Sequence, residues 1–496
     1  MKFKRSSGIL LHPTSLPGPH GCGDFGQDAF RFVDWLVEAK QSLWQMLPLG
    51  PTGMGNSPYM SPSAFAGSPL FVDLHEIVER GWLDKKDIES PPAFHPHKVD
   101  YAAASSFRMP RLKKAAQNFC NHGLTADKTE YERFCESHSS WLSDFALFMA
   151  LYDEHAGALW CNWDSDIVKR DRTAVKKVET DLREQIQFHK FVQWCFFRQW
   201  MSLKSYANGK GVRIIGDIPI FVAHNSVDVW SSPDMFFLDE HGYPTVVAGV
   251  PPDYFSPTGQ RWGNPLYRWD VMQQSGYQWW KERLRHSFSL FDIVRIDHFR
   301  GFLAYWEVSA NERTAERGQW VKSPGEDLFE KVFDSFGSLP IVVEDLGIIT
   351  PDVTALREKL ELPGMKVLQF AFDDGLNHPN LPHNHGTRCM VYTGTHDNDT
   401  TVGWFRRIDS KMKKFVLEYA KSDGTSIQWD MIRLASESKA DTSIFPIQDV
   451  LGLGNEARMN YPGTSTGNWE WRFTWDFFIE EHSAKLHSLT TANRRN

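Results

Sequence analysis

The sequence predicts an α/β protein built on a closed (β/α)8 barrel, the TIM-barrel fold, with largely helical subdomains inserted between strands. Eight short apolar runs recur along the 496 residues, and each has the length of a strand that is buried on both faces. Helical periodicity separates most of these runs, as expected for a parallel sheet covered by helices. An open doubly wound sheet is the alternative, but no glycine-rich phosphate turn follows an early strand.

Each predicted strand is a non-alternating run of apolar and often β-branched residues, and several runs end in glycine, proline, histidine or a carboxylate. Strands of a barrel are covered on both faces, so neither face needs polar residues. In chain order, the predicted strands are residues 8–12, 43–49, 212–217, 291–297, 341–345, 366–370, 390–394 and 443–447.

Apolar residues at spacings of three and four predict the helices between these strands. No helical pattern is apparent between the sixth and seventh strands, where residues 373–383 are rich in Asp, Asn and Pro. The clearest helical stripes cover residues 29–36, 188–203, 328–336 and 353–360.

Two stretches between predicted strands are too long for ordinary crossovers and indicate insertions. We expect a single catalytic barrel over residues 1–496, with an inserted helical subdomain at about residues 75–205. A second insertion is expected at about residues 220–290. It contains residues 247–265, a segment rich in Pro, Gly and aromatic residues with no evident structure of its own. Loops of that length commonly serve as lids or binding loops.

The composition argues against several classes of partner. Sixty-two acidic and 54 basic residues give a net charge of −8, so no global field attracts nucleic acid or an anionic membrane. No apolar stretch approaches the ~20 residues of a membrane span, and the one near the start is too short for a signal peptide. The six cysteines form no C-x-x-C pair, which favours a reducing compartment. We therefore expect a cytoplasmic protein that binds neither nucleic acid nor membrane.

Four carboxylates fall at or just past the ends of four predicted strands: Asp217, Asp297, Glu344 and Asp397. Closure of the barrel would bring them to one mouth, where the chemistry of this fold takes place. Burying charged groups is costly unless they are paired, so carboxylates repeated at such positions need a reason. Two carboxyl groups facing each other across a substrate are what cleavage of a glycosidic bond requires.

The position of Arg295 suggests how the work is divided between two of these carboxylates. Arg295 precedes Asp297 by two residues, so both point to the same side of the strand. A neighbouring Arg keeps a carboxylate ionised, whereas burial and a nearby like charge raise the pKa of a second one. We therefore interpret Asp297 as the ionised member and Glu344 as the proton donor. The alternative is a structural ion pair between Arg295 and Asp297, with Asp217 and Asp345 capping the helices that follow them.

Metal binding is the main rival use of such residues. Two H-x-H fragments, residues 95–97 and 383–385, lie in loops away from the carboxylates, and no H-E-x-x-H motif or EF-hand loop occurs. A serine nucleophile is also disfavoured, because there is no G-x-S-x-G elbow. We expect no catalytic metal and no cofactor.

Aromatic residues in predicted loops suit a polysaccharide groove, because flat aromatic faces cover the apolar faces of sugar rings. Packing of the loops onto the barrel is the alternative, and we expect it for about half of them. The aromatic residues in question are Tyr59, Tyr254, Phe255, Trp262, Trp469 and Trp471.

Several segments resemble those of glycoside hydrolase family 77, the 4-α-glucanotransferases or amylomaltases, which are relatives of the α-amylases. The resemblance covers nearly the whole chain in the family's order. One departure is Cys22, where the family more often has a small aliphatic residue. The matching segments are residues 7–17, 56–67, 216–222, 295–301, 343–347, 394–398 and 458–464.

The resemblance implies a role for each of ten residues. It makes Asp297 the nucleophile, Glu344 the general acid/base and Asp397 the stabiliser of the transition state. The long loop at 247–265 matches the family's active-site loop. The residues implied in substrate binding are Tyr59, Asp217, Gln260, Trp262, Arg295, His396 and Asn468.

The resemblance also implies the reaction. A segment of an α-1,4-glucan or maltooligosaccharide would pass to the 4-hydroxyl of another glucan, of glucose or of maltose, by a retaining double displacement through a covalent glucanyl-aspartate. No residue spacing distinguishes this transferase from a hydrolase that uses the same carboxylates. A non-catalytic glucan-binding protein is a further alternative, but binding alone gives no reason for carboxyl groups on both sides of a scissile bond.

Overall fold

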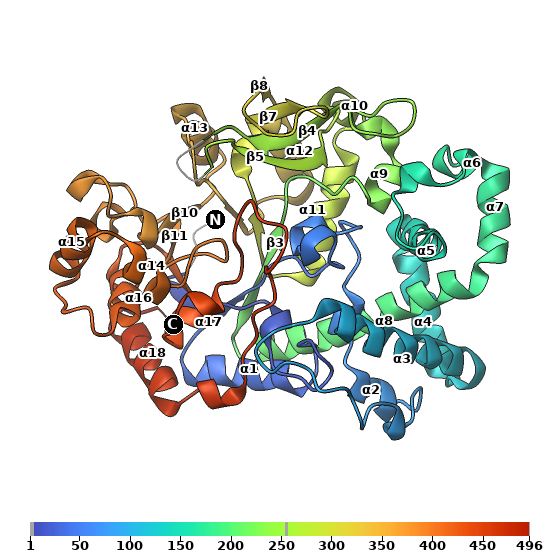
Figure 1. Cartoon of the computed structure of the whole chain (residues 1–496), viewed down its shortest axis with the longest axis horizontal. Helices are drawn as coiled ribbons and strands as arrows, with labels where there is room; N and C mark the ends of the chain where they lie inside the picture. The colour runs from blue at the N-terminus through green and yellow to red at the C-terminus, as the bar shows by residue number, and fades with distance from the viewer. Residues whose placement is uncertain (1–3, 253–255, 496) are drawn as a thin grey trace.

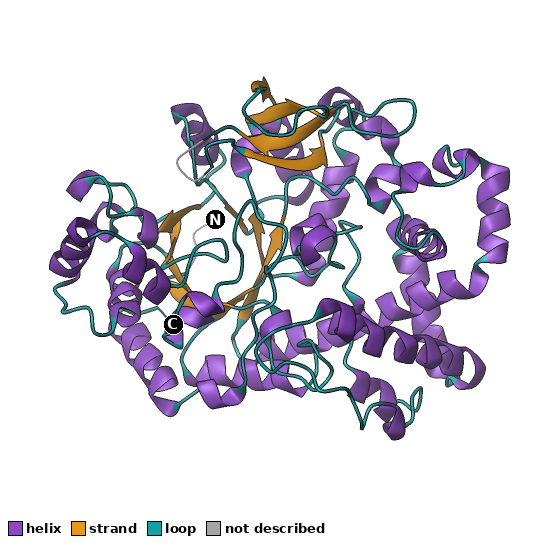
Figure 2. Ribbon diagram, viewed as in Figure 1, coloured by secondary structure: helices purple, strands orange, loops and turns teal. Residues whose placement is uncertain are grey.

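The computed structural model describes residues 4–252 and 256–495, and at its centre is a barrel of eight parallel strands (Figures 1 and 2). The order of the strands in the sheet is β10-β11-β12-β1-β2-β3-β6-β9. All eight predicted strands are confirmed, with ends shifted by a few residues. The barrel strands are β1 (Ser6–Leu10), β2 (Leu43–Gln45), β3 (Arg213–Ile218), β6 (Ile293–Ile296), β9 (Ile341–Val343), β10 (Gly364–Val367), β11 (Cys389–Tyr392) and β12 (Thr442–Pro446).

The barrel closes by different means at its two joints. At one joint, β1 pairs in parallel with both β12 and β2, so that Ile9 lies between Phe445 and Trp44. At the other, β9 and β10 are the two ends of the hydrogen-bonded order. The amide of Val343 donates to the carbonyl of Pro363 at 3.0 Å, which joins the two strands just before β10 begins.

Asp345 strengthens the joint between β9 and β10. Its Oδ1 accepts the amide of Met365 at 2.7 Å, and its Oδ2 lies 3.1 Å from Nε of Arg357. Asp345 therefore stabilises the barrel wall between β9 and β10, although it directly follows Glu344 in the chain.

Helices cover the outside of the barrel wherever the sequence has a strong apolar stripe. The four predicted stripes correspond to α1, α8, α12 and α13. Between β10 and β11 the described chain has only short 310 turns, consistent with the missing helical pattern there. The helices that follow or cover the barrel strands are α1 (Gln27–Glu38), α8 (Arg183–Gly209), α11 (Gln278–Leu290), α12 (Gly325–Phe336), α13 (Pro351–Lys359), α14 (Thr401–Arg407), α15 (Ser410–Ala420), α16 (Ile427–Glu437), α17 (Ile447–Val450) and α18 (Glu480–Ala492).

A group of helices between β2 and β3 lies to one side of the barrel, on the right in Figure 1. Its packing is strongly aromatic: the ring of Trp82 lies 5.2 Å from Phe119 and 5.3 Å from Trp194 of α8. Helix α8 therefore contributes both to this group and to the barrel. The members before α8 are α2 (Leu74–Glu79), α3 (Tyr101–His122), α4 (Thr125–Ser137), α5 (Ser139–Glu154), α6 (Ser165–Val168) and α7 (Arg172–Asp181).

A four-stranded antiparallel sheet stands beside the barrel, at the top of Figure 2, and the sequence did not predict it. Two of its strands, β4 (Val246–Val250) and β5 (Gln260–Pro265), bound the segment that we expected to lack structure of its own. That expectation is wrong at both ends of the segment, and residues 253–255 lie outside the described residues. The other two strands, β7 (Ala304–Ser309) and β8 (Gly318–Lys322), follow β6. Between β3 and β6 lie the short helices α9 (Val227–Ser231) and α10 (Trp269–Gln274).

The distant partner strand explains why the small sheet was missed. β4 pairs with β7, and Val247 lies opposite Val308, about sixty residues further along the chain. A local sequence pattern cannot reveal such a pairing.

Among the helices of the described residues, none is long and apolar enough to cross a membrane.

Candidate active site

Three of the four carboxylates at the strand ends lie around Tyr59, and the fourth, Glu344, lies near Asp297. Asp217 is in β3, Asp297 follows β6, and Asp397 lies in the loop after β11. Burial raises the pKa of Tyr59 well above its ordinary value, and the charges of Asp217, Asp297 and Asp397 raise it further. Glu344 follows β9 and interacts electrostatically with Asp297. The structure therefore brings all four together, as barrel closure predicts.

Arg295 joins two of the carboxylates. Its Nη1 lies 2.6 Å from Asp217 Oδ2 and its Nη2 lies 2.9 Å from Asp297 Oδ1, which confirms that Arg295 and Asp297 point to the same side. Burial alone would lower the pKa of Arg295, but these two carboxylates raise it well above its ordinary value. The guanidinium thus stays charged in a buried place and forms ion pairs with both Asp217 and Asp297.

Glu344 is held by backbone amides and carries a strongly perturbed pKa. Its Oε2 accepts the amide of His298 at 2.9 Å, and its Oε1 accepts the amide of Leu346 at 2.6 Å. Burial first, and the charge of Asp297 second, raise the pKa of Glu344 to about 8. The group is therefore protonated at neutral pH while Asp297 is paired with Arg295. The assignment of Asp297 as the ionised member and Glu344 as the proton donor stays a prediction.

His298, directly after Asp297, contacts both Glu344 and Trp262. Its backbone is left-handed, with φ of 52°, and this turn directs its amide towards Glu344. Burial lowers the pKa of its imidazole to about 4, so the ring is neutral. The ring meets Trp262 edge to face at 4.9 Å, and Trp262 Nε1 donates to Gln260 Oε1 at 3.2 Å. Strand β5 thereby brings Gln260 and Trp262 next to the carboxylates.

Asp397 is fixed by a loop from the far end of the chain. Asn460 Nδ2 donates to Asp397 Oδ1 at 2.6 Å, and Arg458 Nη2 donates to the Asp397 carbonyl at 2.7 Å. Nε2 of His396 lies 3.4 Å from the same Oδ1. The Arg458 guanidinium in turn stacks over the ring of Tyr461 at 4.2 Å. The side chain of Asp397 is therefore oriented from two directions.

Comparison with known proteins identifies the family of this chain. The model of the 4-alpha-glucanotransferase family, glycoside hydrolase family 77, matches residues 11–477. The chain belongs to this family. The 4-alpha-glucanotransferase of Thermus thermophilus is 50% identical over 504 residues, which cover 100% of each chain. That of Synechocystis sp. is 48% identical over 494 residues, 99% of this chain and 98% of the relative.

A solved structure extends the likeness to three dimensions. Amylomaltase from Streptococcus agalactiae, in complex with acarbose, is 38% identical and superposes with a TM-score of 0.97. The match covers 99% of this chain and 100% of that one. The barrel and the loops around its mouth thus have the architecture of the 4-alpha-glucanotransferase family.

Two of the aromatic residues that we considered as sugar platforms are buried. Trp469 and Trp471 are 5% and 6% exposed, so the packing alternative holds for both. Trp469 lies 5.8 Å from the rings of both Tyr59 and His396, while Tyr59 stacks on His396 at 5.3 Å. These three rings form one wall of the site. Tyr254 and Phe255 lie outside the described residues.

Asn468 is engaged within its own loop. Its Oδ1 accepts the amide of Tyr461 at 2.8 Å, and its Nδ2 donates to the Thr464 carbonyl at 3.0 Å. Both ends of the side-chain amide are thus used in closing the loop that carries Asn460. A substrate contact by Asn468 stays a prediction.

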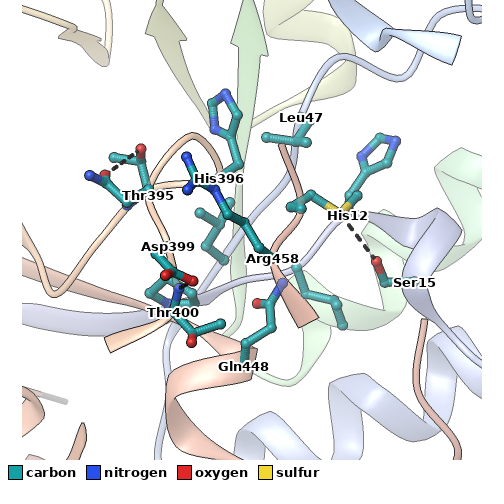
Figure 3. A pocket seen from close by; sticks show the side chains of 14 residues that line it. His12, Ser15, Leu47, Thr395, His396, Asp399, Thr400, Gln448 and Arg458 are labelled. Atoms are coloured by element: carbon teal, nitrogen blue, oxygen red, sulfur yellow. Dashed lines mark hydrogen bonds between the residues drawn. The ribbon is translucent and has the colours of Figure 1, made fainter. Parts of the chain in front are cut away.

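A pocket adjoins the site on the side of His396 (Figure 3). Its lining combines apolar residues with polar residues from three regions, among them His12, Asp399, Gln448 and Arg458. Burial first, and the nearby His396 second, lower the pKa of His12 to about 3. A neutral His12 therefore lies behind the His396 side of the site. No cluster of three potential metal ligands occurs among the described residues.

Sequence reasoning did not single out His298, Arg458 or Asn460, although all three lie in segments that resemble the family. His298 directly follows Asp297, and its position next to a candidate nucleophile was an available signal. Arg458 and Asn460 had no such signal, because more than sixty residues separate them from Asp397 in the chain. Only the fold shows that they support it.

Proposed function

We propose that this protein is a 4-alpha-glucanotransferase in which Asp297 is the nucleophile and Glu344 the general acid/base. Its substrates would be α-1,4-glucans and maltooligosaccharides, with another glucan, glucose or maltose as acceptor. The observation that carries the assignment is the contrast between the two carboxyl groups. Asp297 is paired with Arg295, whereas burial and Asp297 raise the pKa of Glu344 to about 8. Family membership and the amylomaltase-like architecture support the same reaction class.

In the first step, an Asp297 carboxylate oxygen attacks the anomeric carbon while the bond to the glycosidic oxygen breaks. The proton on Glu344 passes to that oxygen, and the leaving sugar departs with a free 4-hydroxyl. The product is a glucanyl ester of Asp297. Glu344 is left as a carboxylate held by the amides of His298 and Leu346.

In the second step, Glu344 acts as a base. It removes the proton from the 4-hydroxyl of the acceptor, whose oxygen attacks the anomeric carbon and displaces the Asp297 carboxylate. Two inversions retain the α configuration. Transfer instead of hydrolysis requires that the acceptor be held in place and that water be kept out.

The supporting residues have matching tasks in this proposal. Asp397, oriented by Asn460, would hold sugar hydroxyls and favour the distorted ring of the transition state. Asp217 accepts from Tyr59 Oη at 2.8 Å and from Arg295 Nη1 at 2.6 Å through Oδ2, and it would support these two groups from beneath the sugar. Tyr59, Gln260, Trp262 and His396 would line the sugar positions beside the cleaved bond.

Incubation with maltotriose tests the reaction class. A transferase gives glucose and a ladder of longer oligosaccharides with little net gain of reducing ends. Growth of reducing ends in step with glucose would instead identify a hydrolase. A protein that binds maltotriose and leaves it unchanged would be a non-catalytic glucan-binding protein.

Two substitutions test the assigned roles. We expect Asp297→Asn and Glu344→Gln each to lower kcat by about three orders of magnitude or more, because each removes a bond-making or proton-transferring group. Thermal melts should show that both variants remain folded. Retention of more than a tenth of the activity by either variant would overturn its assignment.

We also propose that the protein works in the cytoplasm. All six cysteines are free thiols, as expected for a reducing compartment. Fractionation of cells that produce the protein would test this location.

A further inference from the structure

A pair of tryptophans lies across two strands of the small antiparallel sheet. Trp306 of β7 is directly opposite Trp320 of β8, and their ring centroids are 5.2 Å apart at an interplanar angle of 64°. The chain makes room for this arrangement at Gly318, where a Cβ atom would lie 2.6 Å from the indole of Trp306. Trp320 nevertheless remains 38% exposed, which is unusual for so large an apolar side chain.

A cross-strand aromatic pair often has a purely structural role, because it stabilises a hairpin. That role accounts for Trp306, which is partly buried against the sheet. It does not account for the exposed ring of Trp320. Nor does it account for Ile348, which is 51% exposed and belongs to a different part of the chain.

Arg300 lies between the Trp320 ring and the backbone of Ile348. Its guanidinium carbon lies 3.7 Å from the centroid of the Trp320 ring, and its Nη1 donates to the carbonyl of Ile348. Arg300 itself is only 8% exposed, so it acts as a fixed support beneath the two apolar groups. Trp306, Trp320 and Ile348, supported by Arg300, are called the Trp320 platform below.

The platform is continuous with the catalytic mouth. Ile348 belongs to the same short segment as Glu344, and the amide of Leu346 in between binds Glu344 Oε1 at 2.6 Å. Trp320 lies on β8, at the edge of the small sheet opposite β5 with Gln260 and Trp262. Residues 346–348 and Arg300 therefore connect the surroundings of Glu344 with Trp320.

We propose that the Trp320 platform is an outlying contact for the α-1,4-glucan chain whose bond is cleaved between Asp297 and Glu344. This inference rests on the proposed function and adds a determinant of substrate length to it. Sugar rings have apolar CH faces that pack on flat aromatic surfaces, and their hydroxyl edges stay in water. The exposed indole of Trp320, with the exposed Ile348 connected to it through Arg300, offers that kind of surface. Only glucans long enough to reach it would gain from it.

Transfer kinetics on a short and a long substrate test the platform. The ratio of the KM for amylose to the KM for maltotriose should rise about three- to tenfold in Trp320→Ala, since one aromatic contact is lost. Trp320→Tyr, which keeps an aromatic face, should recover most of the wild-type ratio. The matched control is Leu124→Ala, which removes a side chain that is 70% exposed between α3 and α4. Both KM values of this control should equal those of the wild type.

Several results would overturn the platform. An unchanged KM ratio in Trp320→Ala would do so, as would equal changes for both substrates, which would indicate disturbance of the Glu344 segment. If Trp320→Ala fails to fold, Ile348→Ser takes its place with the same expected change of ratio. A change in oligomeric state on gel filtration would assign the surface to a second copy of the chain. Failure of the proposed function is distinct, because the wild type would then form no ladder from maltotriose.

Discussion

At the scale of single residues, the protonation of Glu344 decides the proposed chemistry. The pKa of Glu344 is about 8 in the folded protein, against 4.5 as its ordinary value. Between these pH values the folded protein binds a proton that the unfolded chain has released. The stabilisation from this difference is complete below pH 4.5 and is lost as the pH rises through about 8.

This linkage gives a prediction for Glu344→Gln, whose side chain stays neutral at every pH. The melting temperature of the variant relative to the wild type should increase as the pH rises from 5 to 9, because only the wild type must bury a charge at high pH. Melting curves across this range measure the effect. The exposed Glu132→Gln on α4 should show no such trend. Parallel pH profiles of the melting temperature for Glu344→Gln and wild type would contradict the raised pKa of Glu344.

In the wild type, kcat should fall above pH 8, because the Glu344 acid loses its proton there.

Asn460 gives a second prediction at this scale. Asn460→Ala removes the 2.6 Å hydrogen bond to Asp397, leaving the carboxylate less well oriented. Loss of a hydrogen bond to a charged group predicts a decrease in kcat of about ten- to a hundredfold, with a smaller change in KM. Steady-state kinetics on maltotriose measure both constants. Asn311→Ala, at an exposed position, is the control, and a kcat for Asn460→Ala within a factor of two of wild type would refute the role.

Residue types and spacing were sufficient to predict that Asp297, Glu344 and Arg295 lie together, because strand parity and strand ends are local features of the chain. They were insufficient for Asn460 and Arg458, which reach Asp397 only after the chain has closed the barrel. The left-handed backbone of His298 was equally hidden, since no glycine marks that turn.

At the scale of elements, the tight contact between β3 and the outer layer depends on a glycine. A Cβ atom added at Gly216 would lie 2.1 Å from the ring of Phe291, so the residue before Asp217 must be very small. Asp217 points to the opposite side of the strand, into the site. The close packing of β3 therefore helps to determine where Asp217 lies.

Gly216→Ala should destabilise the protein by about 1–3 kcal/mol, because Phe291 has to move within a packed layer. The melting temperature measures this change. Gly209→Ala serves as the matched control, since a Cβ atom there would meet nothing within 4 Å, and its melting temperature should be unchanged or slightly higher. Equal melting temperatures for Gly216→Ala and wild type would show that Phe291 yields freely.

The elements themselves were predicted where one local signal dominates. Apolar runs predicted the eight barrel strands, and apolar stripes predicted α1 and α8. The four-stranded sheet escaped, because its pairing of β4 with β7 spans the whole of β5, α10, α11 and β6. The Pro and Gly residues between β4 and β5 also made that segment look like a loop.

At the scale of the whole molecule, the partly buried Arg5 and the buried Arg495 tie the region around β1 to that around β12. Arg5 donates to the carbonyls of Ala440 and Asn493 at 3.0 and 2.8 Å. Arg495 is fully buried and donates to the carbonyls of Ser436 and Ser6 at 2.7 and 3.2 Å. These hydrogen bonds thus reinforce the pairing of β1 with β12 at the end of the barrel where both strands begin.

Arg495→Ala should lower the free energy of unfolding by on the order of 3 kcal/mol, because several buried carbonyls lose a charged donor at once. Calorimetry or a thermal melt measures the loss. Arg494→Ala changes the exposed neighbour and should have little effect. A melting temperature within 1 °C of wild type, which corresponds to about 1 kcal/mol for a chain of 496 residues, would exclude a structural role of the expected size for Arg495.

The pairing of β1 with β12 has a consequence for the synthesis of the protein on the ribosome. Residue 6 lies opposite residue 442, so one edge of the first barrel strand has no partner until nearly all of the chain has left the ribosome. At ordinary rates of translation that delay is roughly 20–90 s. An unpaired strand edge invites pairing with other nascent chains. We expect newly made molecules to depend on chaperones during this interval, whereas the finished barrel does not.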